Sequence, residues 1–305
     1  MRLSWNGTDI TGNCTITGCI HRDAAGGRSD SLELTLDRAS VWYRWAPEEG
    51  DRIRITSGEY TTGVMYLTAV IPQRDKYRIL ASSVSPTANR KTWEGFKDVY
   101  FRTILDRCAA ECGMTGKIFG MEENLLIPYA LRKGEGCAAF LNRIATAEGF
   151  RIKAYNGVFR AIYLPWAEEQ EATVRMRIEA SQEGVQYRRR DNQKYTGLTV
   201  LSPWAKATAK DDGAGGNNVR VVTDYPATDK MTAGRWARNL LRDHNRLAEE
   251  ITLDTKLNTA LGALARVHIS GGTDMDGEWI VEEAEHDLKE KNTTAKLLRV
   301  IKTIR

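Results

Sequence analysis

The chain has 305 residues, of which 42% are hydrophobic and 28% charged, an ordinary composition for a globular protein of two or three domains. Its 44 basic residues nearly balance its 40 acidic ones, and a net charge of +4 is too small to indicate a nucleic acid or an anionic membrane as partner. No stretch reaches the roughly 18 apolar residues of a membrane span, and the opening MRLSWNGTDI lacks the apolar segment of a secretory signal. The odd number of cysteines, five, is typical of reduced thiols in a cytoplasm.

Residues 1–88 are predicted to form short strands joined by turns. In SLELTLDRA the residues Leu32, Leu34 and Leu36 alternate on one face, and DRIRITSG, GVMYLTAV and YRILASSV read as further strands. Alternating runs separated by Gly, Asp and Ser, without a helical period, predict a first antiparallel barrel.

Residues 89–170 change character and predict an inserted α+β domain. Two segments, FKDVYFRTILDRCAAECG and GCAAFLNRIATAEGF, carry apolar residues at helical spacing and end at Gly113 and Gly149. The dipeptide Asn156-Gly157 between two strand-like runs is a strong hairpin signal.

Residues 171–230 predict an irregular β subdomain or linker that contains a Gly-rich loop at 211–218. Residues 231–305 predict a helix, with Thr232 as its N-cap, and then the strands of a second barrel, which can take further strands from 171–210. The predicted fold class is therefore α+β and β-rich, with two tube-like antiparallel β-barrel domains, an inserted small α+β domain and a further irregular β/helical region.

The sequence offers no signature of catalysis, so no catalytic residue, metal or cofactor is predicted. The four histidines form no zinc motif, the cysteines lack a two-plus-two arrangement, and no phosphate loop or nucleophile elbow occurs. The basic cluster Arg188, Arg189 and Arg190 lacks the interleaved aromatic residues of a single-strand binder and is interpreted as a solvated or intersubunit face. Trp42 and Trp45 suit an interface or a core equally well.

Two distant segments share a layout. GDRIRITSGEYTTGVMYLTAV begins at Gly50, and LARVHISGGTDMDGEWIVEEA begins at Leu264; a shift of 214 places Arg52 on Arg266 and Ile55 on Ile269. The pattern predicts that alternate aliphatic residues face a core, that the glycines permit the turns, and that Arg52, Arg54, Arg266 and His268 face outward or toward a lumen. The predicted core and turn residues are Ile53, Ile55, Gly58, Gly63, Val267, Ile269, Gly272 and Gly277.

The order of segments, from Asp30 to Arg299, resembles the baseplate hub proteins of contractile phage tails and phage-like particles, the late-control-protein group. The resemblance rests on GDRIRI with its following glycines, on FKDVYFRTILDRCAAECGM, on FLNRIATAEGFRIKAYNG and on the closing ARVHISGG and DGEWIVEEAEHDL. Residues 172–230 depart from it.

The resemblance implies a non-enzymatic structural protein with two tube-like barrels in each chain. A homotrimer of such chains has pseudo-sixfold symmetry, and so can join a sixfold tail tube to a threefold central spike. The resemblance also implies baseplate wedge proteins and the tape measure protein as partners. It implies no contact with a membrane. The implied location is the baseplate of a virion or tail-like particle made in a bacterial cytoplasm.

Three alternatives stay open at this point. The chain could be a hub-like component of a non-contractile tail, a tail-tip cell-wall hydrolase, or an oligonucleotide-binding barrel protein.

Overall fold

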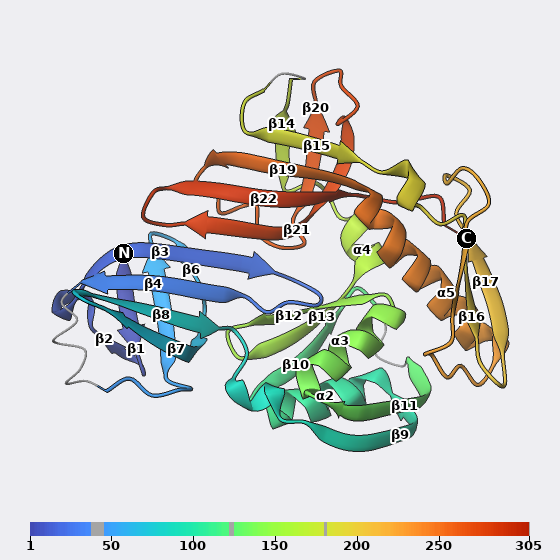
Figure 1. Cartoon of the computed structure of the whole chain (residues 1–305), viewed down its shortest axis with the longest axis horizontal. Coiled ribbons are helices and arrows are strands. Elements are labelled where there is room, and N and C mark those ends of the chain that lie inside the picture. Colours follow the sequence, from blue (N-terminus) through green and yellow to red (C-terminus); the bar gives the residue numbers. More distant parts are fainter. Residues whose placement is uncertain (38–45, 122–124, 180–181, 305) are drawn as a thin grey trace.

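The computed structural model describes residues 1–37, 46–121, 125–179 and 182–304. Trp42 and Trp45 lie outside the described residues. The architecture is β-rich α+β, as predicted. Most strands belong to one large sheet, to which the N-terminal and the C-terminal parts of the chain both contribute (Figure 1).

The N-terminal module is the folded sheet formed by the first eight strands. Alternation drives it: Leu32, Leu34 and Leu36 are fully buried, while the residues between them are partly exposed. The core also takes Trp5, Ile79 and residues from the other strands, so the sheet curls around one apolar cluster. The strands are β1 (Arg2–Trp5), β2 (Thr8–Asp9), β3 (Thr15–Ala24), β4 (Ser31–Asp37), β5 (Arg52–Ser57), β6 (Tyr60–Thr61), β7 (Met65–Gln73) and β8 (Lys76–Ser82).

The inserted domain follows and has its own core. Its two amphipathic helices bury one stripe each, including Phe101 and Leu105 of the first and Phe140 and Leu141 of the second. The Asn156-Gly157 turn joins β12 to β13 with both residues at positive φ, which confirms the hairpin prediction. The elements are β9 (Thr92–Tyr100), α2 (Phe101–Glu111), β10 (Thr115–Phe119), β11 (Leu126–Glu135), α3 (Cys137–Ala147), β12 (Phe150–Tyr155), β13 (Val158–Tyr163) and α4 (Leu164–Glu169).

The C-terminal module is built from strands that precede and strands that follow the third long helix, residues 230–245, in the sequence. Its core includes Trp279, Ile251 and Leu297. The strands are β14 (Val174–Arg177), β15 (Val185–Arg189), β19 (Glu249–Lys256), β20 (Arg266–Ser270), β21 (Gly277–Asp287) and β22 (Asn292–Arg299).

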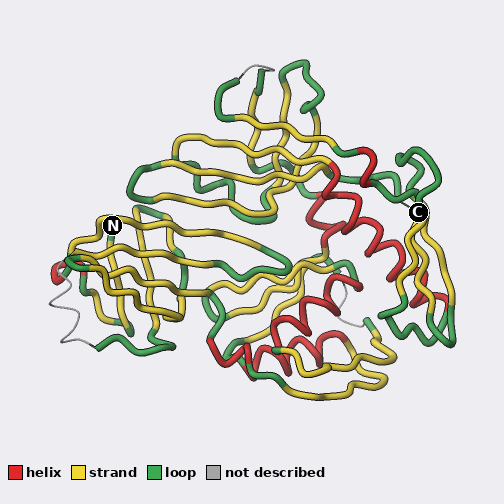
Figure 2. The backbone as a smooth tube through the Cα atoms, in the orientation of Figure 1, coloured by secondary structure: helices red, strands yellow, loops and turns green. Residues whose placement is uncertain are grey.

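The remaining segment forms an outer sheet covered by the long helix. This sheet comprises β16 (Gly197–Leu201), β17 (Lys206–Lys210) and β18 (Val219–Val222), and α5 (Lys230–Asn245) packs on it through Trp236 and Leu240. Residues 171–230, which were predicted to form one irregular subdomain, therefore divide. The strands β14 and β15 join the C-terminal module, whereas β16, β17 and β18 pack against α5. Figure 2 shows the long helices gathered around the inserted domain and the outer sheet.

The predicted N-cap of this helix was wrong by one turn. Asp229 caps α5, and its side chain accepts hydrogen bonds from the backbone N–H of Thr232 at 2.8 Å and from the Thr232 hydroxyl at 2.7 Å. A carboxylate at this position satisfies helix donors that otherwise have no partner, which lets the helix begin before Thr232. Short 3₁₀ helices span Thr11–Asn13, Pro86–Asn89, Asp191–Gln193 and Arg246–Ala248.

Candidate assembly interface

The two similar segments have the same strand register. Arg52 pairs with Tyr66 between β5 and β7, and Arg266 pairs with Ile280 between β20 and β21. Ile53 with Met65 and Val267 with Trp279 form the next pairs. In these two pairs, every partner in the second hairpin lies 214 residues after its counterpart in the first, so the resemblance extends to backbone pairing.

The repeat continues beyond the hairpin. A β-bulge interrupts β7 between Leu67 and Ala69, and another interrupts β21 at the same offset, between Val281 and Glu283. Bulges bend a strand at a fixed position and are seldom shared by chance. The turn that follows β21 is two residues longer than the turn after β7, and the pairing then resumes.

The two modules share a five-strand order. The N-terminal module reads β3-β4-β8-β7-β5, and the C-terminal module reads β15-β19-β22-β21-β20. They differ at the next strand: β1 pairs antiparallel with β5, whereas β14 pairs parallel with β20. The second module is therefore not purely antiparallel.

The predicted core and turn residues have equivalent places in the two modules. Ile53, Ile55, Val267 and Ile269 are each at most 1% exposed. The predicted glycines all have positive φ, in the region that favours glycine. Their φ values are 62° for Gly58, 70° for Gly63, 76° for Gly272 and 124° for Gly277.

One outward-facing residue was predicted wrongly. Arg52 and Arg54 are exposed, but Arg266 is only 5% exposed. Its guanidinium donates to the Trp279 carbonyl at 3.1 Å and to Glu278 at 2.6 Å. Arg266 is buried because these acceptors in β21 satisfy its charge, whereas His268 stays half-exposed beside Glu278.

The two modules meet strand to strand. The second half of β21 leaves β20 and pairs antiparallel with β3, placing Glu283 opposite Ala24 and Asp287 opposite Ile20. On the outer face Arg22 contacts Glu285 at 2.5 Å. We call this contact the intrachain joint; it merges both modules into one sheet.

The inner face of the intrachain joint holds two opposed histidines. His21 and His286 pair in register, His21 Nδ1 lies 2.6 Å from the Tyr60 hydroxyl, and His286 Nδ1 lies 2.9 Å from the Thr293 hydroxyl. Burial lowers the pKa of His21 to about 4 and lowers that of His286 as well. Both rings are therefore neutral at pH 7. Neither histidine has a role predicted from the sequence, although His21 continues the buried alternation of β3 after Cys19.

Lys153 fastens the inserted domain to this joint. Its ammonium is an ion-pair partner of Asp23 and lies 3.0 Å from Asp30 Oδ1. Burial raises the pKa of Asp30 to about 6, while Asp30 and Asp23 raise the pKa of Lys153 against the effect of its own burial. The pairing links residues more than 120 positions apart.

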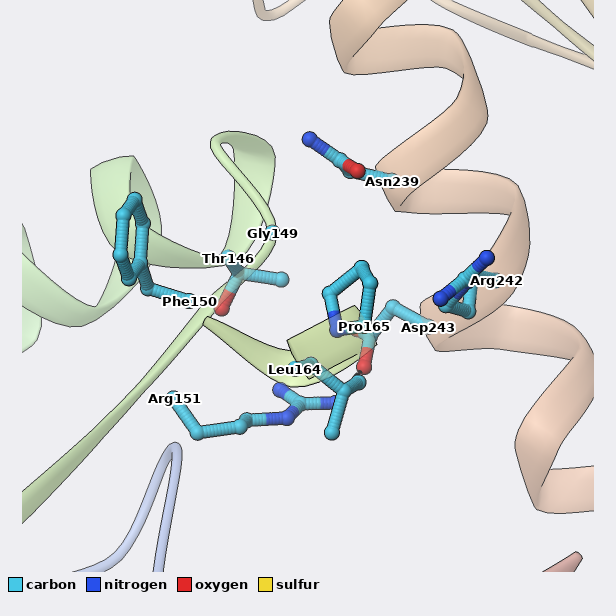
Figure 3. Close-up of a pocket in the computed structure, with 9 residues that line it drawn as sticks. All are labelled: Thr146, Gly149, Phe150, Arg151, Leu164, Pro165, Asn239, Arg242 and Asp243. Carbon is cyan, nitrogen blue, oxygen red and sulfur yellow. Dashed lines mark hydrogen bonds and ion pairs between the residues drawn. The ribbon is translucent and has the colours of Figure 1, made fainter. Parts of the chain in front are cut away.

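A second polar contact holds α5 against the inserted domain. Arg151 of β12 pairs with Asp243 of α5 (Figure 3). Arg242 lies 3.1 Å from Glu168 of α4. The cavity between them has about 10 Å³, enough for one water molecule and too little for a substrate.

The predicted basic cluster lies on and just beyond β15, the last strand of the sheet path. Arg188 lies 2.7 Å from Glu250, Arg190 lies 3.2 Å from Glu250, and Arg189 lies 2.7 Å from Asp191. These charges are therefore partnered within the chain and do not form a free basic groove.

Within the described ranges, no group of three or more His, Cys, Asp or Glu side chains could hold a metal ion. In the same part of the chain, no helix is long and apolar enough to cross a membrane. The five cysteines are free thiols.

Solved structures of other proteins share this architecture. No protein-family model matches the sequence, and no curated protein does. Among solved structures, a 43 kDa tail protein of prophage MuSo2 from Shewanella oneidensis superposes with a TM-score of 0.71 at 13% identity, covering 98% of this chain and 96% of that one. A tail protein from Neisseria meningitidis gives 0.75 at 11% identity with the same coverage. The fold is that of phage tail proteins.

This finding confirms the resemblance to the hub group at the level of fold. A further similar structure is an E. coli component of the type VI secretion system, described as structurally similar to the T4 tail proteins gp27 and gp5. It superposes with a TM-score of 0.61 at 10% identity, covering 99% of this chain and 78% of that one. All these identities are low, so the shared property is the arrangement of modules.

Proposed function

We propose that the protein is the structural hub of a contractile tail or injection particle, a homotrimer that joins a sixfold tail tube to a threefold central spike. The supporting observation is that one chain carries two modules with the same strand register, already joined edge to edge. Three chains then supply six similar modules in a ring, which meets the tube on one side and keeps threefold order on the other.

The surface formed by the inserted domain and the outer sheet suits further baseplate partners. Trp93 of β9 is 75% exposed and Trp204, beside the outer sheet, is 67% exposed. A hollow of about 640 Å³ between the inserted domain and the outer sheet is lined by Tyr129, Trp204 and Trp236. Tryptophan is enriched in binding hot spots, so we assign this side to wedge proteins and the module ring to tube, spike and tape measure proteins.

We assign the protein no catalytic role and place it in the baseplate of a virion or tail-like particle. A hub-like role in a non-contractile tail is the second candidate, because the same modules serve any sixfold tube. The hydrolase alternative predicts release of soluble fragments from purified peptidoglycan. The oligonucleotide alternative predicts salt-sensitive binding to a single strand.

The decisive experiment is the mass of the purified protein in solution, followed by negative-stain images. We expect three times the chain mass and a ring with a central hole. A monomer at all concentrations up to about 100 µM, with no ring on addition of tube or spike protein, would overturn the proposal.

A further inference from the structure

We propose that the ring closes through a β-strand contact between chains, in which β7 of one chain pairs antiparallel with β15 of the next, in the register set by the intrachain joint. This inference rests on the proposed trimer and names the surface that builds it. We call the contact the interchain joint.

Both strands have an edge for this contact. The first half of β7 pairs with β5, but on that side of β7, from Ala69 to Gln73, no described strand follows. In β21 the equivalent stretch, 283–287, pairs with β3. β15 is the terminal strand at one end of the sheet path and pairs with β19 alone among the described strands. Unpaired edges of this kind are templates for another strand.

The repeat identifies β15 as the counterpart of β3. Leu67 pairs with Ala81, Ala81 with Leu32, and Leu32 with His21. The equivalent path in the C-terminal module runs from Val281 to Leu297, then to Ile251, and ends at Tyr187. Tyr187 therefore occupies the position of His21.

The register of the interchain joint follows by substitution. In the intrachain joint Glu285 faces Arg22 and His286 faces His21. The equivalent pairs between chains are Ile71 with Arg188 and Pro72 with Tyr187. The ends of the contact become Ala69 with Arg190 and Gln73 with Gln186.

The interchain joint is weaker than the intrachain joint by two interactions. Ile71 stands where Glu285 forms its 2.5 Å contact with Arg22, so Arg188 gains no new ion pair. Pro72 stands where His286 supplies a backbone N–H, and proline has none. A proline on a free edge also discourages random pairing of the separate chains. The chain thus has one permanent joint and one that forms on assembly.

The register can be tested by a disulfide between chains. Leu288 N donates to the Cys19 carbonyl at 2.9 Å, so residues 284, 286 and 288 bond to β3 and 285 does not. The pair Ile71 and Arg188 is therefore non-hydrogen-bonded, with Cα atoms about 4.5 Å apart, which suits a disulfide. The two residues lie seven strands apart within one chain and cannot react with each other there.

The double variant Ile71→Cys/Arg188→Cys is oxidised with glutathione disulfide, which accepts the two electrons and two protons lost by each thiol pair. On a non-reducing gel we expect covalent dimers and trimers that a reductant returns to monomers. Ile71→Cys/Arg189→Cys is the matched control, because its thiols would lie on opposite faces of the sheet. Each single variant controls for the native cysteines.

The outcomes separate the two proposals. A reduced double variant that sediments as a trimer but gives no more cross-linking than the control would overturn the register and leave the hub function standing. If the unmodified protein is a monomer, both proposals fail.

A gain-of-contact variant provides a second test without cysteine. Ile71→Glu restores the charge present at Glu285 and, opposite Arg188, should lower the trimer dissociation constant roughly two- to fivefold per joint. Ile71→Gln should not reproduce this gain. Equal dissociation constants for the two variants would count against the register.

Discussion

His21 is the residue at which joining the two modules has its clearest electrostatic consequence. The residue is 2% exposed, its Nδ1 contacts Tyr60, and it faces His286 across the intrachain joint. A buried imidazole with few polar partners resists protonation, because the charged form would lose its hydration. The intrachain joint is therefore most stable with these histidines in their neutral form.

Acid should weaken the intrachain joint through this residue. The pKa of His21 is lowered from 6.5 to about 4, so its contribution to stability is present above pH 6.5 and is lost as the pH falls toward 4. At pH 4.5 the loss is about 2 to 3 kcal/mol. The stability advantage of the native protein over His21→Gln, measured by urea unfolding, should shrink by that amount between pH 7 and pH 4.5.

The comparison between variants isolates His21 from Asp30, whose effect has the opposite sign. The pKa of Asp30 is raised to about 6, so its contribution to stability increases as the pH falls from 6 toward 4. Asp30 is present in both proteins and cancels in the difference. A gap between the two proteins that stays constant with pH would contradict this account.

Among the elements, α5 is held in place by several side chains outside its own sequence. Glu148, at the C-cap of α3, is 1% exposed and lies between the inserted domain and the helix. It accepts from Arg235 at 2.6 Å and from the Trp236 indole at 2.5 Å. This buried carboxylate therefore holds the first half of α5 on the inserted domain, in addition to the Arg151–Asp243 and Arg242–Glu168 pairs further along the helix.

Removing this carboxylate should loosen the helix. Glu148→Ala leaves the Trp236 N–H and the Arg235 charge without their partner, and we expect a loss of about 3 kcal/mol in unfolding free energy. Differential scanning calorimetry measures it, because separate domains can melt in separate transitions. Glu169→Ala, an exposed glutamate on α4, is the matched control and should change stability by less than about 0.5 kcal/mol. Equal melting curves for the two variants would contradict the role given to Glu148.

The whole molecule contains one large hydrogen-bonded sheet, and two of its strand edges, that of β15 and that of the second half of β7, are the ones proposed to meet in the ring. The intrachain joint contains the Arg22–Glu285 pair, buried histidines and the Lys153 anchor. The interchain joint lacks the counterparts of Glu285 and of the His286 N–H. Chains should therefore separate before they unfold.

This order can be measured in a urea series. Analytical ultracentrifugation should report loss of the trimer at a lower urea concentration than circular dichroism reports loss of strands, because the interchain joint has fewer interactions than the contacts that hold each chain folded. Added salt should change the urea concentration at which the trimer dissociates only slightly, because the interchain joint gains no ion pair. Mass and circular dichroism falling together in one transition would argue against two joints of unequal strength.

Local sequence determined much of the fold. Alternation in SLELTLD and RIRITS placed Leu34 and Ile55 inside, helical spacing located α2 and α3, and Asn156-Gly157 produced its hairpin. Even the bulge-bearing strands of the two modules were visible as a shift of 214 residues. Side-chain periods and turn chemistry act over a few residues, which is why they can be read from the sequence.

Only the tertiary structure decided which strand edges meet. The pairing of β3 with β21, the parallel contact of β14 with β20 and the burial of Arg266 depend on residues far apart in the chain. A strand's sequence specifies its two faces but hardly its edges, because every edge presents the same N–H and C=O groups. The choice of neighbour follows from where bulges turn the strands and from which charged groups find partners across the joint, and both are settled when the whole chain packs.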